Sequence, residues 1–178
     1  TMLLVIISTV GNGMIRLQKS QAAGSYGSNY GLFVAADASQ LKEVNRRAEI
    51  DATGTMCTEG IIKGNENGGF VCMDETARKM LPYNKEYELK EGKYPGGTQE
   101  IAAGRAFFSE MGYDDVKVGD TVTLDYRAGM QSEYKPEEFV VSGILYDRDE
   151  YTIEASYVAF GSQEFYDEHV AENDRQYN

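Results

Sequence analysis

The stretch from residue 89 to residue 126 constrains the fold more than any other part of the chain, because it holds four structural signals in a fixed order. Glycine and proline residues mark an exposed turn over 92–97, and a short apolar strand is predicted over 100–102. A helix follows over 105–111, ended by a glycine at the usual C′ position. Residues 121–126 then alternate apolar and polar side chains, as a strand with one buried face does. The stretch therefore predicts a strand, a helix and a second strand in succession.

The rest of the chain carries shorter patterns of the same two kinds. They predict strands and helices as follows: strands over 31–36, 52–63, 70–73, 138–146 and 151–160, and helices over 40–48, 75–81 and 163–172. Helix N-caps are expected at Asp37 or Ser39, at Asp74 and at Ser162. Together the elements predict an α+β fold of two small lobes, a β-α-β lobe at about 30–87 and a mixed or antiparallel sheet lobe with short helices at about 88–172. Alternation and helix spacing predict the core of the sheet lobe: Ile101, Phe107, Val122, Leu124, Val140, Ile144 and Phe160.

The first 26 residues form a separate segment, predicted as an N-terminal stalk helix and a linker. Residues 2–10 are an apolar run that is too short to cross a bilayer, since crossing takes about 20 apolar residues. Five apolar residues recur at alternating spacings of four and three, which begins a helical seam: Leu3, Ile7, Val10, Met14 and Leu17. Two interpretations stay open from these residues: a buried element of the globular domain, or the outer end of a transmembrane helix. An exposed stripe of this kind predicts self-association through the N-terminal helix.

The charge balance argues against one class of partner. The chain holds 29 Asp and Glu residues and 17 Lys and Arg residues, for a net charge of −12. Such a surface repels phosphate backbones, so we expect no nucleic-acid partner. The 13 tyrosines mark either a binding face or half-buried positions along sheets.

The sequence carries no familiar catalytic, metal-binding or nucleotide-binding motif. His169 is the single histidine, and without a G-x-S-x-G motif we interpret it as a solvated surface residue. Two cysteines and one histidine are too few for a closed zinc site, and neither phosphate-binding glycine motif is present. The acidic cluster at 147–154 lacks the spacing of an EF-hand, and the two acids at 114–115 fit a helix-to-strand turn. We therefore predict no catalytic residue, no metal ion and no cofactor.

The two cysteines are placed symmetrically about the glycine- and asparagine-rich turn at 64–69. In a symmetric hairpin around that turn, Cys57 lies directly opposite Cys72, with Cβ atoms about 4.5–5.5 Å apart. The pair is therefore a disulfide candidate, which would close a loop of about 15 residues and stabilise the fold by about 3 kcal/mol. Two buried free thiols are the alternative. A stable disulfide would place the domain in an oxidising compartment.

Four segments of the chain recur in a known family. They are Gly92-Lys93-Tyr94-Pro95, Gln99-Glu100-Ile101, the Val-Gly-Asp-Thr-Val-Thr-Leu run at 118–124 and the Phe-Val-Val-Ser-Gly-Ile-Leu-Tyr-Asp run at 139–147. In this order and spacing they resemble the extracytoplasmic core domain of MacB/FtsX-type ABC transporter permeases. The family usually has Asn where this chain has Gln99. The resemblance covers residues 89–147 well and the flanking segments less well.

The resemblance implies a non-catalytic domain on the extracytoplasmic side of a cell membrane. Residues 1–26 would be the end of a transmembrane or stalk helix with its linker, and residues 27–178 the core domain. Such a domain binds an exported or sensed substrate, or a partner protein, and passes motion to or from an ABC ATPase subunit. The substrate itself stays unknown, because the family has no shared substrate motif in this region.

Two functions from other classes stay open. The first is a free secreted module that binds a ligand or a protein through its tyrosines, and the second is a secreted hydrolase. The permease expectation differs from both because it requires further membrane spans in the same gene product and an ATPase partner.

Overall fold

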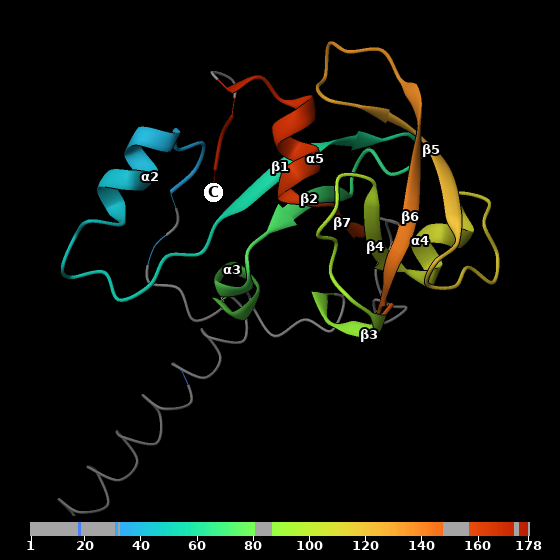
Figure 1. Cartoon of the computed structure of the whole chain (residues 1–178), viewed down its shortest axis with the longest axis horizontal. Coiled ribbons are helices and arrows are strands. Elements are labelled where there is room, and N and C mark those ends of the chain that lie inside the picture. The colour runs from blue at the N-terminus through green and yellow to red at the C-terminus, as the bar shows by residue number, and fades with distance from the viewer. Residues whose placement is uncertain are drawn as a thin grey trace, which may run out of the picture.

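The computed structural model describes residues 18, 31, 33–80, 87–147, 157–172 and 175–177. In this part of the chain the structure holds four short helices, which are α2 (Ala38–Val44), α3 (Glu75–Met80), α4 (Arg105–Glu110) and α5 (Gln163–His169) (Figure 1). It also holds seven strands, which are β1 (Met56–Ile62), β2 (Gly69–Met73), β3 (Leu89–Gly92), β4 (Glu100–Gly104), β5 (Thr121–Arg127), β6 (Lys135–Leu145) and β7 (Val158–Phe160). None of the described helices is long and apolar enough to cross a membrane.

The strands form one sheet that closes on itself. Their order is β3-β6-β4-β7-β2-β1-β5, and β5 pairs in addition with β6, so six strands make a ring and β3 stands outside it. The pairs β4–β6 and β2–β7 are parallel, whereas the other four pairs of the ring are antiparallel. The fold is therefore a closed six-stranded barrel with one extra strand and short helices around it.

The predicted two-lobe α+β fold is wrong. Strand β1, from the first predicted lobe, pairs with β5 of the second through Ile61↔Arg127 and Ile62↔Tyr126. Strand β2 likewise pairs with β7, so the sheet runs through both predicted lobes without a break. Closure into a barrel removes free sheet edges, which two separate small sheets would have left exposed.

Most helices and strands lie close to their predicted positions. Asp37 and Ser162 both act as N-caps, as their predictions stated. The predicted strand over 31–36 is wrong in its described residues, where Ala36 forms a single isolated bridge with Tyr177. The predicted stalk helix, the linker and the self-association that depends on that helix lie outside the described residues, apart from Gln18.

The core prediction is correct except at one position. Six of the seven residues are buried, but Val140 is 42% exposed. The reason is a β-bulge, because β6 pairs Val141 with Ile101 and Gly143 with Ala102, which leaves Ser142 as an extra residue. The buried side of β6 consequently passes from Phe139 and Val141 to Ile144.

Helices α4 and α5 supply aromatic side chains to the barrel core. Phe107 and Phe108 come from α4, and Phe165 comes from α5. Phe165 lies edge-on to Phe70 of β2, with ring centroids 5.5 Å apart. Figure 1 shows α5 (red) lying against β1 and β2, well apart from α4. The two helices thus fix two different sides of the barrel.

Candidate functional site

Two of the family-like segments are held face to face by their glycines. Gly92 at the end of β3 pairs with Gly143 of β6, and the Lys93 backbone N–H donates to the Ser142 carbonyl at 2.9 Å. A Cβ on Gly143 would lie 2.5 Å from the Lys93 carbonyl oxygen, so this approach requires glycine. The segments at 92–95 and 139–147 therefore make one structural joint.

Glu100 holds the turn that precedes β4. Its carboxylate accepts backbone N–H bonds from Gly96 at 2.7 Å and from Gly97 at 3.0 Å, and it forms an ion pair with Lys93 at 2.8 Å. The hydrogen bond from Lys93, followed by those from the two glycines, lowers the pKa of Glu100 to about 2. The ionised carboxylate of Glu100 therefore stabilises the conformation of this turn.

Asp120 and Asp147, the two aspartates of the family-like segments, also accept backbone hydrogen bonds that hold local structure. Asp120 accepts the Lys117 backbone N–H at 2.9 Å and so closes the turn before β5. Asp147 accepts the Ala106 backbone N–H at 2.8 Å, which satisfies one free donor in the first turn of α4. These carboxylates therefore hold turns and a helix start of the barrel in place.

His169 is half-buried rather than solvated, in contrast to the prediction. Its ring stacks on Phe165 with centroids 3.9 Å apart, and its Nδ1 lies 2.9 Å from the Phe165 carbonyl oxygen. Tyr126 approaches the same ring edge-on at 5.5 Å. These contacts give the histidine a packing role at the C-terminal turn of α5.

The cysteine register is as predicted. Cys57 of β1 pairs directly with Cys72 of β2, and both side chains are buried under α5. Both are free thiols in the structure, so the disulfide itself stays a prediction. Both Sγ atoms lie near the same Gln163 Oε1, at 3.7 Å for Cys57 and 3.6 Å for Cys72. A hydrogen bond with Cys57, followed by burial, raises the pKa of the Cys72 thiol.

Glu59 is the group that the sequence prediction missed. It sits at a β-bulge in β1, its side chain is 0% exposed, and within the described residues neither carboxyl oxygen has a hydrogen-bond partner. Burial, and to a smaller extent the nearby Cys72, raises the pKa of Glu59 well above its usual range. Gly161 gives it room, since a Cβ there would overlap the Glu59 carboxyl. A charged residue two positions after Cys57 in an apolar strand was the available signal.

A cleft opens between the start of α5 and the end of β2. Its volume is about 390 Å³, and its lining comes from three segments: Cys72, Met73 and Asp74, then Pro95 and Gly96, then Gly161, Gln163 and Glu164. The turn held by Glu100 therefore forms one wall of the cleft, and Cys72 lies at another. Thr98 donates a long hydrogen bond of 3.5 Å to Glu164 beside the cleft.

The predicted acidic positions fall in different places. Of the cluster Asp147, Asp149, Glu150 and Glu154, the last three lie outside the described residues. The acids at 114–115 lie in the turn after α4, as predicted, where Asp114 accepts a hydrogen bond from Ser109 at 2.6 Å. Among the residues that the structure covers, no group of three or more His, Cys, Asp or Glu side chains is arranged to hold a metal ion.

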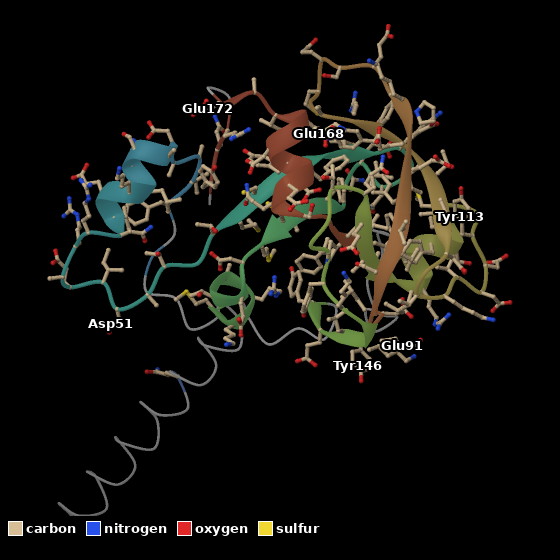
Figure 2. The ribbon with its side chains drawn as sticks, in the orientation of Figure 1. Asp51, Glu91, Tyr113, Tyr146, Glu168 and Glu172 are labelled. Carbon is tan, nitrogen blue, oxygen red and sulfur yellow. The ribbon has the colours of Figure 1, made fainter. Side chains whose placement is uncertain are left out.

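Figure 2 labels exposed side chains at α5 and at the β3 edge. Figure 2 shows Glu168 on α5 and Glu172 just after it, both exposed. Glu91 and Tyr146 lie together at the β3 edge in the same view, where Glu91 forms an ion pair of 3.2 Å with Arg105. Tyr146 is 41% exposed, whereas the other described tyrosines are buried or half-buried.

Comparison with known proteins gives no assignment. No protein-family model matches the sequence, and a search of curated proteins finds no match.

Proposed function

We propose that this barrel is a non-catalytic extracytoplasmic domain of an ABC transporter permease. In this role it binds an exported or sensed substrate, or a partner protein, and transmits motion between that ligand and the membrane and ATPase parts of the transporter. The proposal rests on the resemblance of residues 89–147 to the MacB/FtsX-type core domain.

One structural observation supports it. The family-like segments, which are spread along the sequence, meet around β3, β4 and β6 and each perform a task in the same frame. Glu100 accepts backbone hydrogen bonds in the turn before β4, and Asp147 accepts one from the first turn of α4. Gly143 permits the close approach of the Lys93 backbone. If members of a family share a fold but no catalytic activity, the residues that they have in common should be ones that maintain the fold.

The alternative of a secreted module that binds through its tyrosines receives less support. Of the described tyrosines only Tyr146 is exposed, at 41%, and Tyr126 and Tyr166 are buried in the packing around α5. Most of these rings are therefore committed to the barrel.

The first test is to read the gene from which this chain derives. The proposal requires that the frame also encode apolar spans of about 20 residues and that an ABC ATPase copurify with the full-length product. A full-length product without such spans would overturn the proposal and favour the secreted module.

The second test uses the intact transporter and the cleft. Glu164 lines the cleft at the start of α5, and Glu168 is exposed on the same helix but is not among the cleft-lining residues. Glu164→Lys should alter the coupling between ligand and ATP hydrolysis, whereas Glu168→Lys should leave it unchanged. If both variants change this coupling equally, or if neither does, the cleft is not where the ligand acts.

A further inference from the structure

The Cα spacing of the cysteine pair lies within reach of a disulfide. The Asp74 backbone N–H donates to the Thr55 carbonyl at 3.1 Å, which makes 55 and 74 a hydrogen-bonded pair of the β1–β2 ladder. Cys57 and Cys72 are two residues further along each strand in the same register, so they form a pair of the same kind. Cα atoms in such pairs are about 5.5 Å apart, which lies within the range that a disulfide spans.

The first turn of α5 covers this pair. Gln163, the first residue of the helix, accepts weak hydrogen bonds from both thiols, and Tyr166 one turn later packs against both cysteines. Gln163 is itself exposed, so one side chain separates the thiols from solvent at this point. The turn is held in place by Ser162, whose hydroxyl accepts the Phe165 backbone N–H at 3.0 Å.

Covering the thiols suppresses their chemistry. Thiol–disulfide exchange needs a thiolate, and the hydrogen bond with Cys57, together with burial, raises the pKa of Cys72 and keeps its thiol protonated. The cleft is the adjoining space, because both Cys72 and Gln163 line it. Displacement of the first turn of α5 would therefore expose the sulfurs to the cleft and remove the part of the rise in the Cys72 pKa that comes from burial.

We propose that Cys57 and Cys72 are a reversible thiol–disulfide site that the first turn of α5 gates. The co-reactant is a small-molecule disulfide or a disulfide on a partner protein. One cysteine thiolate attacks it, forms a mixed disulfide and releases one thiol. The second cysteine thiolate then attacks the mixed disulfide, forms the Cys57–Cys72 bond and releases the second thiol. The two protein thiols are oxidised and the reagent is reduced to two thiols, so atoms and electrons balance.

Oxidation would in turn change α5. The two S–H donors to Gln163 Oε1 are lost when the disulfide forms, so the start of the helix loses two of its contacts with β1 and β2. The site couples the oxidation state of the hairpin to the position of α5, beside the cleft. This coupling rests on the thiol geometry alone and does not depend on the permease assignment.

The experiment measures disulfide formation in the folded chain with oxidised glutathione as the reagent. Intact mass after quenching by alkylation distinguishes two free thiols, a glutathione adduct and an internal disulfide. Ser162→Ala removes the cap of α5 and should speed formation of the internal disulfide by about five-fold. Ser162→Gly, which weakens the cap less, should give a smaller increase. Asp147→Ala is the matched control, because it removes the corresponding acceptor from α4, away from the thiols.

We expect the wild-type chain to form the internal disulfide slowly, to release it on addition of dithiothreitol, and to share its rate with Asp147→Ala. If Cys57 and Cys72 remain free thiols after the chain is unfolded and refolded in oxidised glutathione, the proposed disulfide site is wrong. Equal acceleration by Ser162→Ala and Asp147→Ala would overturn the gate, since it would mean that general loosening exposes the thiols. Wild-type thiols that react as fast as those of the unfolded chain would overturn it as well.

Discussion

Replacement of Glu59 by Gln should stabilise the protein more and more as the pH rises. Glu59 is fully buried and its carboxyl oxygens lack hydrogen-bond partners among the described residues, so ionisation would place an unpaired charge in the barrel. Burial therefore raises its folded-state pKa well above the ordinary value of 4.5. Gln has nearly the same shape and stays polar but cannot ionise, with an NH2 group in place of the carboxyl O–H, so the variant mainly removes the ionisation.

The sign follows from proton binding in the two states. Above pH 4.5 the unfolded chain loses the Glu59 proton, whereas the folded chain keeps it up to its raised pKa. The folded state then binds more protons than the unfolded state, so the wild-type stability falls as the pH rises through this window. The loss is about 1.4 kcal/mol for each pH unit, and it stops once the folded-state pKa is passed. Below pH 4.5 the two proteins should have nearly equal stability.

Urea melts between pH 4.5 and pH 8 measure this difference, and tyrosine fluorescence can follow unfolding because the chain has 13 Tyr and no Trp. Glu59→Met removes the polar atoms too and should be about 1–3 kcal/mol more stable than Glu59→Gln at every pH. Glu110→Gln, at an exposed position of α4, is the control and should leave the pH dependence unchanged. Parallel pH curves for Glu59→Gln and the wild type, or a clear loss of stability at pH 7, would refute a neutral, unpaired Glu59.

Three further substitutions test the frame of the barrel. Leu124→Ala should lower the free energy of unfolding by about 2–5 kcal/mol because Leu124 is buried in the core, and a loss below about 0.5 kcal/mol in urea melts would contradict the core assignment. Gly143→Ala should cost about 1–3 kcal/mol through overlap with the Lys93 carbonyl, and an unchanged melting midpoint would show that β3 can move aside. Glu100→Gln should remove stability that the wild type keeps above pH 4.5 and loses as the pH falls towards about 2, so the two acid-unfolding curves should converge there. A constant gap between those curves down to pH 2 would mean that the charge of Glu100 is not what holds the turn.

Local signals in the sequence predicted local structure well. The cap of α5 at Ser162 follows from a serine placed before a helical pattern, and the pairing of Cys57 with Cys72 follows from a symmetric turn. Neither depends on anything distant in the chain. For the same reason the cysteine pair was the part of the candidate site that sequence reasoning could place.

Closure of the barrel could not be predicted in that way. It depends on the parallel pairs β4–β6 and β2–β7 and on the β1–β5 pair, which join segments far apart in the sequence. Alternation of apolar residues shows that a strand has a buried face, but not which strand lies beside it. The bulge at Ser142 could not be predicted for the same reason. It comes from the pairing of β6 with β4, and the apolar pattern along β6 alone does not show that Val140 lies outside.

The barrel has two short joints, β4–β7 and β5–β1, and the buried Glu59 lies beside the second. Strand β5 pairs with β6 from Thr121 to Tyr126. It pairs with β1 through only two residues, Tyr126 and Arg127, at the C-terminal end of β5. Across that short joint the Tyr126 hydroxyl donates to the Glu59 carbonyl at 2.6 Å, and the aromatic ring also contacts Phe165 of α5. A displacement of α5 would therefore reach this joint through the contact between Phe165 and Tyr126. Glu59 therefore lies where ionisation of its buried carboxyl would act directly on the short β1–β5 joint.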